Sequence, residues 1–305
     1  MTKEAETLIQ VGLAAMVADG DRHEAEVGRL RASAEALGVD PALLDATNAG
    51  LPADLGSRLA NEENRRAAYE FAVAVCNADG AANETERRFL AGLRGMLGLS
   101  EGDVLSWHRD ASALATAATT PPPPSAPAAP NPSEVDETIL RQAKLTGALE
   151  LLPQSLATMA IIPLQMRLVY GIGQAYGQNV PASQITDLLG TLGIGMAAQV
   201  VDGVARKIVG GVFQGVLGSL LGGLTGGVAV AATGAATSFV TTYALGHVAK
   251  RYYEQGRRLG ADDLRQLFEQ LKGEATTLYP QVKSQVESQA QSLDLGSILR
   301  SVGRG

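Results

Sequence analysis

A run of 42 residues, from Ile208 to Ala249, contains no Asp, Glu, Lys or Arg. Small residues recur along it at every fourth position: Gly211, Gly215, Ser219, Gly223, Gly227, Ala231 and Ala235. Glycine inside a water-exposed helix costs about 1 kcal/mol relative to alanine. A series of glycines at helical spacing therefore indicates a compensating gain, and close contact between two helices supplies one.

The length of this run favours a hairpin. As one helix it would measure about 63 Å, roughly twice the thickness of a hydrocarbon core. A turn over residues 222–227 would divide it into two antiparallel legs, and the cationic residues Arg206, Lys207, Lys250 and Arg251 would place both ends on the cytoplasmic side. The sequence thus predicts a hairpin that is embedded in a membrane or re-entrant. Because residues 208–221 form a short first leg, a hairpin buried in the core of a soluble bundle is the alternative.

The rest of the chain predicts an all-α fold. Apolar residues make up 46% of the chain and aromatic residues only 4%, so the core must be built from small and aliphatic side chains. Apolar residues recur at helical rather than strand spacing. Helices are expected over residues 5–17, 24–37, 62–77, 84–97, 135–152 and 164–177, and another from residue 261 that is interrupted at Pro280. Ser183 is expected to cap a helix that begins near Gln184.

A proline-rich segment divides the chain into two domains. Residues 111–133 are Ala, Thr, Pro and Ser for the most part, with four consecutive prolines at 121–124, and such a segment is expected to be extended. Residues 1–110 carry 19 acidic against 11 basic residues, and residues 134–305 carry 13 against 14. The acidic first domain argues against a nucleic-acid partner, since phosphate binding requires a basic surface. The acidic charge instead favours a metal cation or the basic surface of a protein as the ligand of the first domain.

Two similar acidic turns lie in the first domain. The first contains Asp19 and Asp21 and is followed by Glu26, and the second contains Asp79 and is followed by Glu86. Carboxylate oxygens gathered at a helix junction are ligands for hard cations such as Ca²⁺ or Mg²⁺. The structural alternative is a capping box, in which Asn83 and Glu86 satisfy the first amides of a helix. The sequence is compatible with both a cation site and a capping box.

The helix–Ala-Asp-Gly–helix arrangement resembles the TerB-like fold of tellurite-resistance proteins. The similarity covers roughly residues 4–100 and rests on two copies of the pattern, at 18–26 and 78–86. It implies a small helical domain with an internal two-fold repeat, divalent-metal binding at the acidic turns, and a link to membrane-associated stress responses.

Residues 145–260 resemble YcjF-like proteins of bacterial inner membranes. The residues that carry this resemblance lie in five short segments: 163–166, 169–172, 176–177, 242–246 and 252–256. The resemblance implies membrane association and unknown biochemistry, and since such proteins also occur fused to or beside GTPases, a GTPase is one candidate partner. The chain itself has no Walker-type phosphate loop, so nucleotide hydrolysis would belong to the partner.

No catalytic set is apparent. The three histidines are scattered, Cys76 is the single cysteine, and no nucleophile elbow or zinc motif occurs. We therefore expect a non-enzymatic membrane-associated adaptor or sensor of the bacterial inner membrane, with its first domain and its C-terminus cytoplasmic. It would bind a divalent cation or a protein partner, or associate with itself through the glycine-rich hairpin. The alternatives are a cytoplasmic interaction module with the hairpin in its core, and a membrane-shaping or pore-like oligomer.

Overall fold

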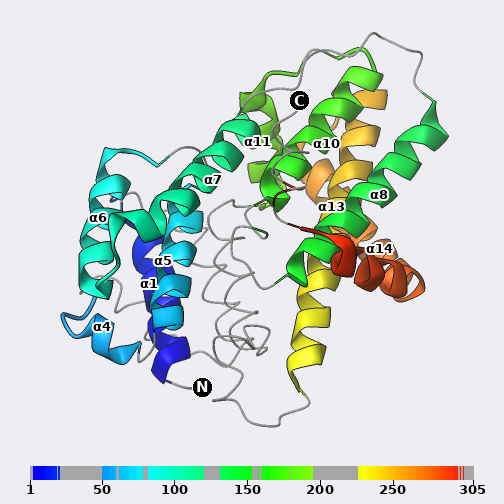
Figure 1. The fold of residues 1–305 in the computed structure, drawn as a ribbon. Coiled ribbons are helices and arrows are strands. Elements are labelled where there is room, and N and C mark those ends of the chain that lie inside the picture. The colour runs from blue at the N-terminus through cyan, green and yellow to red at the C-terminus, as the bar shows by residue number, and fades with distance from the viewer. Residues whose placement is uncertain are drawn as a thin grey trace. The chain divides into compact units, whose positions relative to one another are not determined.

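A computed structural model describes residues 3–18, 20, 50–59, 62–77, 82–119, 131–152, 157, 160–178, 180–194, 226–294, 296 and 298. Every regular element within these ranges is an α-helix (Figure 1), which confirms the predicted all-α class. The chain divides into two compact units. The first comprises Met1–Ala115, Pro153–Met159 and Met196–Ala231, and the second comprises Thr116–Leu152, Ala160–Gly195 and Ala232–Gly305.

The first unit contains α1 (Lys3–Met16), α4 (Leu55–Arg58), α5 (Glu62–Cys76), α6 (Glu84–Leu97) and α7 (Glu101–Thr119). Helix α1 packs against α5, and the contact depends on a glycine. A Cβ atom at Gly12 would lie 2.3 Å from the Phe71 ring, so only glycine lets this buried ring lie against the α1 backbone. The predicted helices over 5–17, 62–77 and 84–97 are confirmed, and the predicted helix over 24–37 lies outside the described residues.

Helix α6 begins and ends as its sequence predicts. Asn83 accepts hydrogen bonds from the backbone amides of Thr85 and Glu86, and the Glu86 carboxylate accepts one from the amide of Asn83. The helix ends at Gly98, whose φ of 66° lies in the left-handed region that glycine occupies without steric cost. The capping-box interpretation of Asn83 and Glu86 is therefore confirmed.

Helix α7 corrects the predicted start of the linker. We expected an extended segment from residue 111, but α7 continues to Thr119. This stretch is rich in alanine, the best helix former, and the run of prolines begins only at Pro121. The next helix begins at Pro132, which is the N1 position where proline is favoured.

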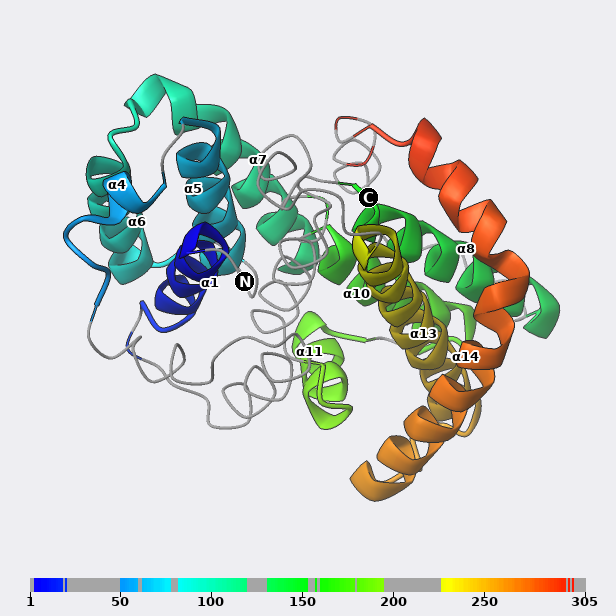
Figure 2. The ribbon, with the colours of Figure 1, turned by 90° about the horizontal axis from the view of Figure 1, so that it is seen from below.

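The second unit contains α8 (Pro132–Glu150), α10 (Ile161–Ala175), α11 (Ala182–Thr191), α14 (Ala261–Ser292) and, from Ala232 onward, α13 (Gly226–Glu254). Figures 1 and 2 show α13 alongside α8 and α14 in both views. Their facing side chains form one buried apolar cluster, centred on Phe239 of α13 and on Tyr279, Val282 and Val286 of α14. Helix α13, which contains the second half of the uncharged run, is therefore a central element of this unit.

Two local predictions in this unit are wrong. Ser183 does not cap α11, because the helix begins at Ala182, two residues before Gln184, with Pro181 at the N-cap and no side-chain cap. Pro280 does not interrupt α14, which continues through it to Ser292. Proline inside a helix costs about 3 kcal/mol. Burial of Ala275 and Tyr279 before it, and of Val282 and Val286 after it, offsets that cost.

Candidate functional site

Five polar side chains lie in the apolar interior of the second unit. They form the candidate site of this unit. They are Thr146 and Glu150 of α8, Gln165 of α10, and Ser238 and Thr242 of α13, and each is at most 4% exposed. Burying a polar group is costly unless it finds a partner. A group of five in one core must therefore be held together by mutual hydrogen bonds.

The hydrogen bonds join three helices. The Thr146 hydroxyl lies 2.9 Å from the Thr242 hydroxyl and 3.3 Å from the carbonyl oxygen of Ser238. The Gln165 amide nitrogen donates to the Thr242 hydroxyl at 3.0 Å, and the Ser238 hydroxyl donates to the Glu150 carboxylate at 3.1 Å. The Gln165 amide oxygen is buried and has no hydrogen-bond partner within the described part of the chain. We call these five residues the polar cluster.

Sequence spacing explains how the polar cluster forms. Thr146 and Glu150 are four residues apart, as are Ser238 and Thr242, so each pair occupies one face of its helix. Small residues then let the two faces approach. A Cβ atom at Gly147 would lie 3.0 Å from the carbonyl oxygen of Ala235, which shows that the backbones of α8 and α13 are in close contact.

Helix α14, which packs against α8 and α13, has one buried apolar face and one charged outer face. Helix α14 buries Phe268, Tyr279 and Val286. Its opposite face exposes Asp262, Arg265, Glu269, Glu274 and Glu287. Charged side chains along a whole helix face require water, because each would cost several kcal/mol in hydrocarbon. The side of α13 that α14 covers is therefore a protein interior.

A second group of polar residues joins the start of α8 to the end of α13. Lys250 donates to the Asp136 carboxylate at 2.5 Å and to the carbonyl oxygen of Pro132 at 3.2 Å. The Nδ1 atom of His247 lies 3.7 Å from the same carboxylate oxygen. Burial lowers the pKa of His247 below its usual value, Lys250 lowers it further, and Asp136 and Glu274 oppose the shift.

In the first unit, a tyrosine and a histidine form a contact between α5 and α7. The Tyr69 hydroxyl lies 2.7 Å from Nε2 of His108, and the Tyr69 ring also contacts Trp107, with the ring centroids 6.2 Å apart. Burial raises the pKa of Tyr69 to about 12. Burial also lowers the pKa of His108, and nearby Arg94 adds to that shift. Both groups therefore favour their neutral forms at neutral pH, and the tautomer of His108 decides which of the two donates the hydrogen bond.

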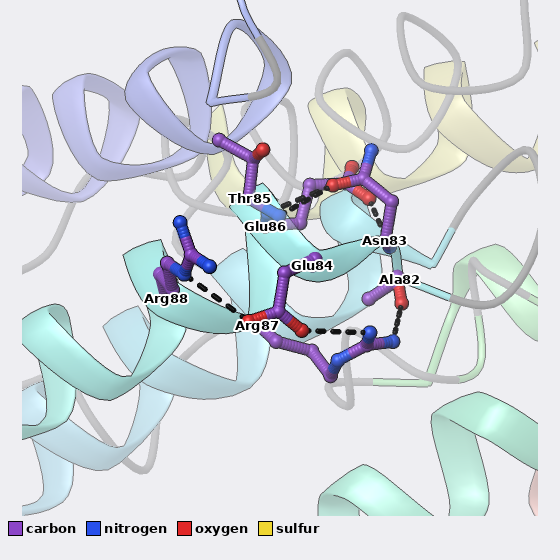
Figure 3. Close-up of polar contacts among 7 residues, drawn as sticks. All are labelled: Ala82, Asn83, Glu84, Thr85, Glu86, Arg87 and Arg88. Carbon is purple, nitrogen blue, oxygen red and sulfur yellow. Dashed lines mark hydrogen bonds and ion pairs between the residues drawn. The ribbon is translucent and has the colours of Figure 1, made fainter.

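The predicted cation ligands are only partly within the structure. Asp19, Asp21, Glu26 and Asp79 lie outside the described residues, and Glu86 is the one member whose side chain is described. Its carboxylate is directed to the amide of Asn83 at 2.8 Å (Figure 3). No group of three or more His, Cys, Asp or Glu suited to a metal ion occurs in the part of the chain that the structure describes.

The predicted hairpin is likewise seen in part. Gly211, Gly215, Ser219 and Gly223 lie outside the described residues, whereas Gly227 lies in α13, which begins at Gly226. The second predicted leg therefore forms as one helix and continues past Ala249 to Glu254. Among the described helices, none combines the length and the apolar character needed to cross a membrane.

Sequence reasoning missed the polar cluster, although a signal for it existed. Gln165 interrupts an uncharged stretch, and Thr146, Glu150, Ser238 and Thr242 form two polar pairs at a spacing of four residues. Such pairs predict a polar contact between two buried helix faces. Chemically, the cluster offers hydroxyl and amide groups beside one carboxylate, an arrangement suited to fixing the register of the helices.

No family model matches the chain, and neither a curated protein nor a solved structure matches it.

Proposed function

We propose that this chain is a non-enzymatic helical adaptor, in which the second half of the uncharged run is a core element of the second unit. Its acidic first unit binds a protein partner or a divalent cation.

One observation carries this proposal: α13 is packed between α8, α10 and α14, and its polar side chains find their partners there. Phe239 packs on Tyr279 of α14, with the ring centroids 5.4 Å apart, and Thr242 is held by Thr146 of α8 and Gln165 of α10. Because α14 presents charges on its outer side, this arrangement suits a bundle surrounded by water. For the second half of the uncharged run, it favours a position in the protein core over a position in the bilayer.

A membrane-attached adaptor is the second candidate, and one feature of the sequence favours it. Residues 208–233 are uncharged and precede the part of α13 that is packed in the bundle. In such a protein, residues 208–233 would attach the chain to the membrane, and the rest of α13 would stay packed in the helical bundle. In this second candidate function, the protein is attached to the inner membrane and its protein partner is a GTPase.

Fractionation of cells that express the full chain separates the two candidates. The core proposal predicts that the protein stays in the supernatant after high-speed centrifugation. Protein that pellets with membranes and resists a carbonate wash would contradict it and favour the tether. A matched variant in which Leu220 and Leu221 are replaced by Asp tests the tether directly, since charges in a bilayer segment are costly and would release a tethered protein from the pellet.

A further inference from the structure

The first turns of α8 are fastened to the last turns of α13 at one point. Lys250 reaches both Asp136 and the carbonyl oxygen of Pro132, the first residue of α8. The backbones are close there, since a Cβ atom at Gly246 would lie 2.7 Å from the Ile139 side chain. These contacts lie at the start of α8, directly after the proline-rich segment. They therefore determine how stably α8 is attached to the rest of the second unit.

His247 shares the carboxylate on which the fastening depends. It lies about one helical turn before Lys250 and faces the same Oδ1 atom of Asp136, at 3.7 Å. Its ring packs on Tyr243, with the ring centroids 4.4 Å apart. The charged groups that act on it are Asp136 from α8, Glu274 from α14, and Lys250 from its own helix.

We infer that His247 makes the attachment of α8 to α13 sensitive to acid. When the imidazole is neutral, Lys250 has Asp136 as its anionic partner. Once the imidazole is protonated, two cations on one face of α13 compete for the Asp136 carboxylate, and the ammonium group and the imidazolium repel each other. The attachment of α8 then weakens.

The direction of the histidine titration agrees with this inference. Burial and Lys250 lower the pKa of His247, and these effects exceed the opposing attraction of Asp136 and Glu274. A histidine whose folded pKa lies below its unfolded value of about 6.5 stabilises the fold at neutral pH. That contribution is complete above the unfolded pKa and is lost as the pH falls from there through the folded pKa. Mild acid therefore loosens the start of α8, whatever partner the chain binds.

The first test follows the imidazole itself by NMR on the full chain. The carbon-bound ring protons of the three histidines are titrated, and the His247 signal is assigned by its absence in His247→Gln. We expect His247 to titrate below the ordinary histidine pKa of about 6.5. A titration at or above that value would overturn the inference, because the folded state would then favour the imidazolium.

The second test follows the fastening by amide hydrogen exchange, corrected for the intrinsic pH dependence of exchange. Between about pH 7.5 and about pH 5.5, where an ordinary histidine changes charge, exchange in residues 132–141 should become severalfold faster in the wild-type chain. His247→Gln should show no such change, and Lys250→Met should exchange faster at both values. Equal pH dependence in the wild type and His247→Gln would contradict the inference. If His247→Gln does not fold, the wild-type titration decides the question.

Discussion

The hydroxyl of Thr146 in α8 lies 2.9 Å from the hydroxyl of Thr242 in α13, and both side chains are fully buried. The Thr242 hydroxyl also accepts a hydrogen bond from the side-chain amide of Gln165 in α10. One hydroxyl therefore links three helices. A bond of this kind fixes the rotation and the axial position of α13 more narrowly than apolar contacts do. It is the clearest sign that this helix belongs to the interior of the second unit.

Replacing Thr242 with Val should therefore destabilise the second unit. Valine keeps the shape of the side chain but leaves Thr146 and Gln165 without their shared partner, and a lost buried hydrogen bond costs about 1–3 kcal/mol. Urea unfolding of the full chain measures this. The matched control is Thr277→Val in α14, where an exposed hydroxyl donates to the carbonyl oxygen of Glu274 in the same helix, and a surface change of this kind stays within about 0.5 kcal/mol. Equal effects at both positions would contradict the role of the polar cluster.

The close packing of α8 on α13 predicts that a larger residue at the contact will destabilise the fold. In Gly246→Ala, the added methyl group would meet Ile139 at 2.7 Å, and overpacking of a buried site costs about 1–3 kcal/mol. Gly273→Ala in α14 is the control, because nothing lies within 4 Å of a Cβ atom there, and the better helix former should stabilise by up to about 1 kcal/mol. Thermal unfolding should shift in opposite directions for the two variants. Stabilisation by both would show that the helices are not in close contact.

Cation binding by the first unit can be separated from helix capping at Glu86. Glutamine at this position still reaches back to the amide of Asn83, so Glu86→Gln should keep the cap, whereas Glu86→Ala should cost about 1 kcal/mol. Calorimetric titration with Ca²⁺ and Mg²⁺ then tests the ligand role. We expect weak binding that Asp19→Ala combined with Asp79→Ala abolishes and that Glu86→Gln reduces. If the wild type and these variants take up cations equally, the acidic turns are structural only.

The Tyr69–His108 contact predicts how the first unit responds to acid. Burial, with Arg94, lowers the pKa of His108 below about 6.5, the value expected in the unfolded chain. The neutral imidazole therefore stabilises the fold above that pH, and this stability is lost as the pH falls through the folded pKa. His108→Gln should flatten the pH dependence of unfolding in this range. An unchanged slope would show that His108 does not contribute to it.

Local chemistry explains which parts of the fold the sequence could predict. Asn83, Glu86 and Gly98 act within one helix, so the limits of α6 follow from their order along the chain. Pro280 was misjudged because the contacts that keep α14 continuous come from other helices, through Tyr279 and Val286. The polar cluster was missed for the same reason, since Gln165 and Thr242 are 77 residues apart. Uncharged composition alone does not distinguish a helix surrounded by lipid from one surrounded by other helices.

Amide hydrogen exchange of α13, on the full chain in buffer without detergent or lipid, tests the central claim most directly. If α13 is packed between α8, α10 and α14, the amides of residues 234–250 should be among the slowest in the second unit and should exchange only when the unit unfolds as a whole. Lipid vesicles should not change their rates. Fast exchange in buffer that becomes slow only when vesicles are added would contradict the account and would make the uncharged run a membrane element.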